Sequence, residues 1–236
     1  MHADMRIERA VAAALDPATG ARCPRGLAAA MQYAVFPGGH RIRPRLCLAV
    51  AEAHDGADPA LVDAALSSLE FLHCASLVHD DMPCFDDAEL RRGKPSVHVA
   101  FGESLALMCG DALIVLAFQT ISRVARCAPR RSADLLSIIS DAVGAPDGIV
   151  AGQSWECESS VPLEDYQRAK TGVLFRAATL AGAAAAGAED SSWGELGDVI
   201  GSAYQIADDL IDRVGDPELI GKPVGQDDRL DRPSSV

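Results

Sequence analysis

The sequence predicts an all-α protein, and two observations carry this prediction. Nearly half of the 236 residues are apolar but only 5% are aromatic, and Ala and Leu dominate the apolar set. Ala and Leu are strong helix formers, whereas β-branched and aromatic residues build strands. Apolar residues also recur with helical spacing almost throughout the chain, and no convincing alternating strand appears. We therefore expect helices near residues 25–36, 44–54, 60–82, 102–127, 132–145, 163–188 and 192–212.

Proline, glycine and capping residues mark where these helices begin and end. Pro37-Gly38-Gly39 interrupts the chain after the first helix, and Pro44 suits the first turn of the second. Asp58-Pro59 opens the third helix, and Gly93 to Pro95 marks a loop. From Gly215 onward the sequence is polar and contains Gly and Pro, which favours a loop. No linker and no internal repeat is visible, so we expect one domain spanning residues 1–236.

Charge, cysteine usage and hydropathy exclude several classes of protein. A net charge of −13 argues against nucleic acid and against an anionic membrane surface. Seven cysteines without a C-x-x-C pair suit neither a disulfide framework nor a zinc site. Met1 to Leu15 lacks the apolar core of a signal peptide, and the longest apolar stretch, Ala177 to Ala188, is too short to cross a bilayer. We therefore expect a cytoplasmic protein without a membrane span.

Two clusters of aspartates are the strongest chemical signal. The first is Asp80-Asp81-Met82-Pro83-Cys84-Phe85-Asp86-Asp87 and the second is Asp208-Asp209-Leu210-Ile211-Asp212. Both lie at the C-terminal end of an expected helix, where the helix dipole disfavours carboxylates. Apolar residues precede both clusters, and carboxylates crowded beside apolar surface need a cation, for which Mg²⁺ suits hard oxygen ligands. The simpler alternative is that both clusters are solvated acidic helix ends.

Basic residues gather in short segments that suit phosphate. Gly38-Gly39-His40-Arg41-Ile42-Arg43-Pro44-Arg45 enters a helix N-terminus, where backbone N–H groups and guanidinium forks favour an anion. Arg91-Arg92-Gly93-Lys94-Pro95 follows the first aspartate cluster, and Lys170-Thr171-Gly172 and Gly221-Lys222-Pro223 add isolated lysines. The alternative is that Arg41 or Arg45 only pairs with surface acids, and that Lys222 is an ordinary loop lysine. Carboxylates for a metal beside cations for phosphate indicate a diphosphate substrate.

In their order along the chain, these motifs resemble the short-chain trans-prenyl diphosphate synthases of the polyprenyl synthetase family, and most closely bacterial geranylgeranyl diphosphate synthases. The resemblance implies the isoprenoid synthase fold, an antiparallel helical bundle around a deep central apolar pocket, and a homodimer. The matching segments are Phe36 to Pro44, His73 to Asp86, Arg91 to Pro95, Gly152-Gln153, Lys170 to Gly172, Tyr204 to Asp212 and Gly221 to Asp227.

The resemblance also implies a role for each matching residue. Mg²⁺ would be the cofactor, with metal ligands at Asp80, Asp86, Asp208 and Asp212. The implied catalytic set is Asp80, Asp81, Asp86, Arg91, Lys170, Asp208 and Asp209. The allylic diphosphate would be held by Arg91, Lys170, Thr171, Gln205 and Lys222. Isopentenyl diphosphate would be held by Arg43, His73 and Arg92, with Gly39 and His40 beside them.

The spacing of His73 supports its implied role independently. His73 lies seven residues before Asp80, about 20° away around a helix, so both side chains point into one cleft. The alternative is a core histidine whose hydrogen bonds are satisfied within the protein.

The reaction that the resemblance implies is head-to-tail condensation of isopentenyl diphosphate with an allylic diphosphate. Product length depends on what closes the pocket below the first aspartate cluster. Farnesyl-producing relatives commonly carry an aromatic residue five positions before the first Asp, whereas this chain has Ala75 followed by Ser76. Geranylgeranyl diphosphate is therefore the expected product.

The chain departs from the family pattern at several positions. His40 replaces the usual Lys, Glu156 replaces a common Asp, and Gln167 replaces a frequent His. Relatives continue for several helices beyond the position of Val236, so the C-terminal helices are expected to be missing and some apolar surface uncovered. The alternatives are a farnesyl diphosphate synthase, a non-catalytic subunit of such an enzyme, and a class I terpene cyclase. Two complete aspartate clusters and the arginine-rich segment argue against the last two.

Overall fold

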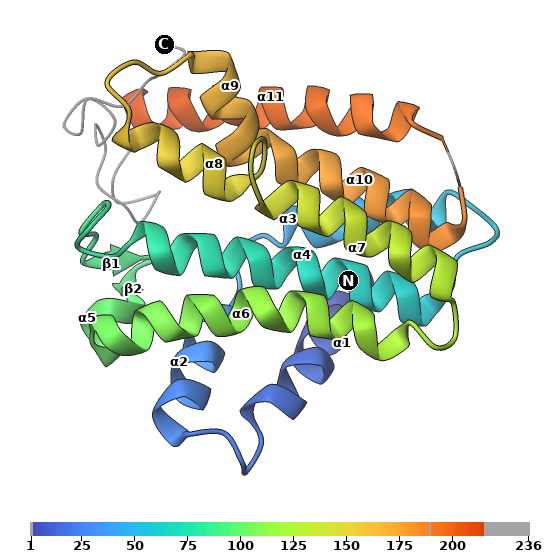
Figure 1. Ribbon diagram of the computed structural model, residues 1–236, viewed down its shortest axis with the longest axis horizontal. Coiled ribbons are helices and arrows are strands. Elements are labelled where there is room, and N and C mark those ends of the chain that lie inside the picture. Colours follow the sequence, from blue (N-terminus) through green and yellow to red (C-terminus); the bar gives the residue numbers. More distant parts are fainter. Residues whose placement is uncertain (1, 189, 215–236) are drawn as a thin grey trace.

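The computed structural model describes residues 2–188 and 190–214, and the side chains in these ranges up to residue 211. The prediction of an all-α protein is confirmed (Figure 1). The helices are α1 (His2–Thr19), α2 (Arg25–Val35), α3 (Ile42–Glu52), α4 (Pro59–Asp80), α5 (Val97–Phe101), α6 (Glu103–Val124), α7 (Pro129–Val143), α8 (Ile149–Ser154), α9 (Leu163–Gln167), α10 (Val173–Ala186) and α11 (Ser192–Val214), with a 3₁₀ turn at Trp155–Cys157 and a π-helical turn at Arg168–Gly172.

Helix α4 is the centre of the bundle, and α6, α10, α3 and α1 pack around it. It begins where the sequence predicts, because the Asp58 carboxylate accepts the backbone N–H groups of Ala60 and Leu61 at 2.9 and 3.3 Å. Its buried side chains cover nearly the whole circumference, and Leu69 and Phe71 are fully inaccessible. A helix that is apolar all round belongs in the core of a bundle. Figure 1 shows α4 between α6 and α10, which both run antiparallel to it.

Helix α1 is an element that the sequence analysis did not assign. Ile7, Val11 and Leu15 recur at intervals of four residues, and all three are buried against the core. This spacing places them on one face of a helix. The helical periodicity of this segment is therefore present in the sequence.

The expected helix at 163–188 is present but is not uniform. Helix α9 passes through the π-helical turn Arg168–Gly172 into α10, and this turn packs against both α8 and α11. A π-helical turn changes the direction in which the following side chains point, and such turns occur frequently at functional sites. Lys170 and Thr171 lie within it.

A minimal β-hairpin lies between the first aspartate cluster and α5. Its strands, β1 (Leu90–Arg91) and β2 (Lys94–Pro95), pair Arg91 with Lys94 in antiparallel register. Arg92 and Gly93 form the turn with φ of 54° and 74°. The sequence predicted a loop here and no strand, because two-residue strands are too short to show an alternating pattern.

Within the described residues, two helices are long and apolar enough to cross a membrane by length and composition alone. They are α4, in which 78% of the most apolar window is buried, and α6, in which the corresponding share is 44%. The burial of α4 identifies it as a core helix. Helix α6 is covered on one face by α4, α2 and α7, while Leu107, Met108 and Val115 of its other face are exposed.

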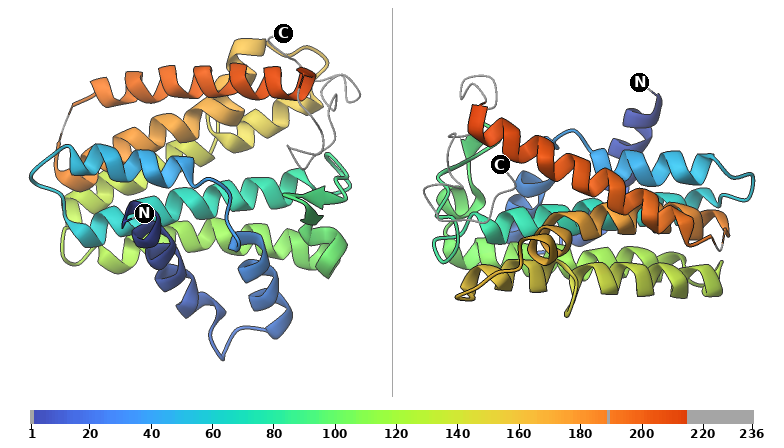
Figure 2. Two further views of the ribbon diagram at one scale, coloured as in Figure 1. Left: turned by 180° about the vertical axis from the view of Figure 1, so that it is seen from behind. Right: turned by 90° about the horizontal axis from the view of Figure 1, so that it is seen from above.

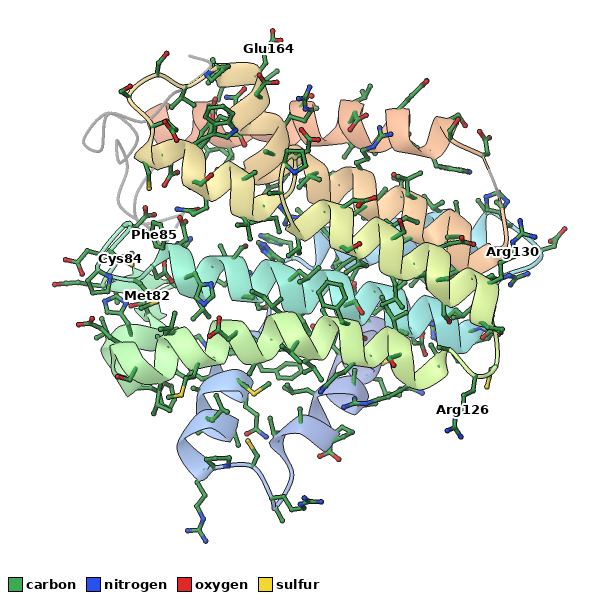
Figure 3. The ribbon with its side chains drawn as sticks, viewed as in Figure 1. Met82, Cys84, Phe85, Arg126, Arg130 and Glu164 are labelled. Carbon is green, nitrogen blue, oxygen red and sulfur yellow. The ribbon has the colours of Figure 1, made fainter. Side chains whose placement is uncertain are left out.

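Both aspartate clusters lie at the same end of the bundle. The C-terminal ends of α4 and α11 lie at the left of Figure 1, beside the β-hairpin, and Figure 2 shows the same arrangement from behind and from above. Figure 3 places Met82, Cys84 and Phe85 in the loop that follows α4, and Arg130 at the opposite end of the molecule.

Candidate active site

The loop after α4 folds back onto the end of the helix. The backbone N–H of Asp86 donates to the carbonyl of Asp80 at 2.9 Å, and the N–H of Ala88 donates to the carbonyl of Asp81 at 3.1 Å. Asp80 and Asp86 are six positions apart in sequence, and these hydrogen bonds bring their backbones together. The predicted pairing of the two carboxylates is thus a consequence of local backbone structure.

Three carboxylates converge at this point. Oxygens of Asp80, Asp86 and Glu156 all lie within 4.8 Å of one another, and all three residues are half-buried. Hard carboxylate oxygens at this spacing fit the preference of Mg²⁺, which is bound in proteins by one or two carboxylates with waters and substrate phosphates. The residues present therefore fit the implied metal.

Asp81 points to a different partner. Its buried carboxylate accepts the Nε–H of Arg91 at 3.0 and 3.1 Å and also a hydrogen bond from the Arg91 Nη2. Burial raises the pKa of Asp81, although the paired guanidinium opposes this rise. Burial alone would lower the pKa of Arg91. The nearby carboxylates of Asp81, Asp80 and Asp208 have the larger, opposite effect, so the pKa of Arg91 is raised. The pair fixes Arg91 beside Asp80, with 3.9 Å between the charged groups.

Lys170 reaches the same carboxylates from the π-helical turn. Its Nζ donates to Asp80 Oδ1 at 3.3 Å and also to Glu156 Oε1. Sequence analysis predicted Lys170 in the site but named Glu156 only as a departure from the family pattern. Gly152, four residues before Glu156, is the sequence signal for this contact. A Cβ at Gly152 would lie 2.5 Å from the backbone N of Lys170, so only glycine lets α8 approach the π-helical turn this closely.

The second aspartate cluster is held by amides. The buried Asp209 accepts hydrogen bonds from Gln205 Nε2 at 2.6 Å and from Gln167 Nε2 at 3.3 Å. Gln205, a predicted ligand of the allylic diphosphate, therefore contacts Asp209 directly. The negative charge of Asp208 acts on the guanidinium groups of Arg91 and Arg43, raising the pKa of each relative to burial alone. The C-terminal ends of α4 and α11, which carry the two clusters, lie at the same end of the bundle (Figure 1).

Two of the predicted residues fall beyond what the structure describes. Lys222 and the side chain of Asp212 lie outside the described residues. Their predicted roles in binding diphosphate and metal stay predictions.

Two arginines of the glycine-rich segment have different surroundings. Arg41 is buried, has φ of 51°, and is bound by Glu8, Glu70 and the carbonyl of Val35. Arg43 is also buried, and its guanidinium lies 4.7 Å from the centre of the Phe175 ring. Burial lowers the pKa of Arg43. Arg41 therefore links Glu8 of α1 to Glu70 of α4. The alternative that Arg41 only forms a surface ion pair is wrong, because Arg41 is buried.

The remaining predicted substrate-binding residues differ in their surroundings. The guanidinium of Arg92 lies so close to Gly39 that a Cβ on Gly39 would be 2.9 Å from it. Burial, and then the guanidinium groups of Arg43 and Arg92, lower the pKa of His73 well below its ordinary value. A neutral imidazole among arginines remains able to donate a hydrogen bond to a phosphate. His40 is exposed, and Thr171 is half-buried beside Lys170.

The positions expected to control product length lie deeper in α4. Ala75 is 1% exposed, and the Ser76 hydroxyl donates to the carbonyl of His73 at 2.9 Å. A cavity of about 30 Å³, the size of a single water, lies beside Cys74, Leu77 and Asp81. The expected deep apolar pocket stays a prediction. A larger cavity of about 560 Å³ lies at the opposite end of the bundle, beside Arg130 and Arg131.

Comparison with known proteins identifies one family. The sequence model of the polyprenyl synthetase family matches residues 24–236. The chain is 54% identical to the geranylgeranyl diphosphate synthase of Cereibacter sphaeroides over 233 residues, covering 99% of this chain and 81% of that protein. It is 51% identical to the geranylgeranyl diphosphate synthase of Rhodobacter capsulatus over 236 residues, covering 100% of this chain and 82% of that protein.

Solved structures give the same picture. A geranyltransferase from Helicobacter pylori, complexed with magnesium and isoprenyl diphosphate, superposes with a TM-score of 0.80 at 32% identity and covers 89% of this chain and 73% of that chain.

Proposed function

The chain belongs to the polyprenyl synthetase family, and from this premise we propose that it is a prenyltransferase that makes geranylgeranyl diphosphate. It condenses isopentenyl diphosphate head-to-tail with allylic diphosphates. The observation that carries the proposal is the convergence of Asp80, Asp86 and Glu156 within 4.8 Å, next to the cationic groups of Lys170 and Arg91. Metal-ligating carboxylates beside phosphate-binding cations are what a diphosphate leaving group requires.

Asp80 and Asp86, together with Asp208 and Asp212 of α11, would hold Mg²⁺. Bound there, the metal would supply Lewis acidity that draws negative charge from the departing diphosphate. The fit of the carboxylates to Mg²⁺ supports this assignment, and so does the magnesium named in the Helicobacter pylori complex.

The cationic side chains divide between the two substrates. Arg91, Lys170 and Thr171, with Gln205 and Lys222, would bind the allylic diphosphate next to the carboxylates. Arg43, His73 and Arg92 would bind isopentenyl diphosphate, with Gly39 leaving room for the Arg92 guanidinium. An apolar interior matters because water would capture the allylic cation before the isopentenyl double bond reached it.

Ala75 and Ser76 would leave the pocket open below the first aspartate cluster. Both residues are small, and Ala75 is buried five residues, about one and a half helical turns, before Asp80. A chain growing from the diphosphate site along α4 would meet no aromatic side chain at this position. This supports geranylgeranyl diphosphate over the shorter farnesyl product.

The quaternary structure is a homodimer in this proposal. Leu107, Met108 and Val115 expose an apolar face of α6, each with about half of its surface accessible, and such faces mark protein–protein contacts. The protein is proposed to be cytoplasmic, with residues 1–236 forming a single prenyl synthase domain.

Direct assay tests the function. Purified protein is incubated with isopentenyl diphosphate, each allylic primer and Mg²⁺, and the dephosphorylated products are separated by chromatography. We expect a twenty-carbon product that disappears when EDTA removes the metal. Absence of elongation with every primer would contradict the proposal and favour a non-catalytic subunit. A fifteen-carbon end product would favour a farnesyl diphosphate synthase.

A further inference from the structure

Among the described residues of the site, Glu156 has three hydrogen-bond partners, and the family resemblance gave it no role. It lies in the 3₁₀ turn Trp155–Cys157 that follows α8. One of its oxygens accepts the Tyr166 hydroxyl at 2.6 Å and the ammonium of Lys170, and the other accepts Gln153 Nε2 at 2.8 Å. Two neutral donors from different elements, α8 and α9, thus fix the carboxylate in place.

Lys170 lies between Glu156 and the first aspartate cluster. Its side chain is 19% exposed, and its ammonium also donates to Asp80 at 3.3 Å. An ammonium has three N–H donors. Glu156 and Asp80 take two of these, and a third is left for an oxygen of a substrate bound beside Asp80.

A long flexible lysine would not keep this position without support. Lysine carries about 2 kcal/mol of rotamer entropy, so its placement requires a fixed counter-charge. Glu156 supplies that charge, and Gly152 allows α8 to lie against the π-helical turn so that the two groups meet. Asp80 is a poorer anchor because its carboxylate is also expected to bind metal.

We propose that Glu156 is a positioning residue, which holds the ammonium of Lys170 so that its remaining N–H binds the allylic diphosphate. This inference rests on the proposed function, because it assumes that a diphosphate binds beside Asp80. Glu156 acts through Lys170 and needs no contact with substrate. The competing role is that of a third metal ligand, since its oxygens lie within 4.8 Å of those of Asp80 and Asp86.

A double-mutant cycle separates these two roles. The variants are Glu156→Gln, Lys170→Met and the double variant, with Glu156→Asp as the conservative change. Glu158→Gln is the matched control, because it removes the same charge from an exposed position two residues away. Steady-state kinetics give kcat and KM for each substrate. Calorimetry of inorganic pyrophosphate binding in the presence of Mg²⁺ measures diphosphate affinity in the absence of catalysis.

Glu156→Gln should raise the KM for the allylic diphosphate and weaken pyrophosphate binding by about tenfold, the scale of one charge-assisted hydrogen bond. The KM for isopentenyl diphosphate should change less than twofold. Glu156→Asp should recover part of the loss, and Glu158→Gln should behave as the wild type. In the Lys170→Met background, Glu156→Gln should have no further effect, because coupled residues are non-additive.

Additive effects of the two substitutions would overturn the inference, because Glu156 would then act independently of Lys170, as a metal ligand does. Wild-type kinetics in Glu156→Gln would also overturn it while leaving the proposed function intact. If the wild type neither binds pyrophosphate nor elongates a primer, the proposed function itself fails. Circular dichroism establishes that each variant is folded.

Discussion

The carboxylates after α4 are held by cations, whereas the buried carboxylate of α11 is held by amides. Asp81 is paired with Arg91, and Asp80 receives the ammonium of Lys170. Asp209 instead receives Gln167 and Gln205. The two sequence motifs look alike, with adjacent aspartates followed by a further aspartate, but the partners that the fold supplies differ in charge.

This difference separates two ways of preparing a carboxylate for metal. A cationic partner neutralises part of the negative charge of a carboxylate before any metal binds. An amide partner orients the carboxylate by hydrogen bonding but adds no positive charge. In the proposed function, the first cluster would hold both metal and phosphate, and the second cluster would supply further metal ligands.

The largest expected effect is on catalysis. Asp80→Asn should lower kcat by about 10³-fold, since it removes a metal ligand and a partner of Lys170 together. Asp208→Asn should lower kcat by about 10²-fold, because it removes one carboxylate of the second cluster but no contact of Lys170. Both are measured by steady-state assay at saturating Mg²⁺.

Asp87→Asn is the control for these two variants. Asp87 is exposed, and asparagine tolerates its φ of 48°. It should retain wild-type activity. Equal losses in Asp80→Asn and Asp208→Asn would show that the two clusters contribute alike.

The partners should also differ in what they contribute to stability. Arg91→Met leaves the buried Asp81 without its counter-charge and should lower the free energy of unfolding by about 3 kcal/mol. Gln205→Met removes one of the two amides that hold Asp209 and should lower it by about 1 kcal/mol. Urea denaturation measures both values. Arg126→Met, at an exposed position (Figure 3), should change stability little. A larger loss for Gln205→Met than for Arg91→Met would contradict the contrast between the clusters.

Product length gives a third comparison between the helices. Ala75 and Ala203 each lie five residues before the first aspartate of a cluster, but Ala75 is buried and Ala203 is exposed. Ala75→Phe should shift the product from twenty towards fifteen carbons, whereas Ala203→Phe should not. Chromatography of the products measures the shift. Ala75→Phe could fail to fold because the added ring overpacks the core. Ser76→Phe is therefore a second test of the same region, at a half-buried position that accommodates a ring more easily. An unchanged product in both α4 variants would refute the assignment of this region.

The last comparison concerns the pH dependence of stability. His73 lies seven residues before Asp80, and the corresponding position before Asp208 is Gly201, so only the first cluster has an imidazole there. The pKa of His73 in the folded protein is far below its value of about 6.5 in the unfolded chain. Below pH 6.5, the unfolded chain therefore binds a proton at His73 that the folded protein does not bind. Stability should therefore fall on acidification, by up to about 1.4 kcal/mol per pH unit for this group.

Thermal unfolding of the wild type and His73→Gln between pH 7 and pH 5 measures this contribution. The variant should lose less stability than the wild type over this range. An identical pH dependence of stability in the two proteins would contradict the conclusion that His73 is neutral in the folded protein.

Much of the fold was predictable because helices are encoded locally. The expected boundaries of α4 and α11 agree with the structure to within two residues, since Asp58-Pro59 marks the start of α4 and the apolar periodicity runs through both segments. The small deviations arise at the ends, where hydrogen bonding frays. The π-helical turn at Arg168–Gly172 was not predictable, because it depends on packing against α8 and α11.

The amino-acid sequence by itself determined the helical class, the two aspartate clusters, the arginine-rich turn and the family. These follow from residue type and short-range spacing. Tertiary structure alone decided that Glu156 joins Asp80 and Lys170, that Arg41 is buried beside Glu70, and that amides hold Asp209. Most of these contacts join residues far apart in the chain, and their partners are selected only when the helices pack.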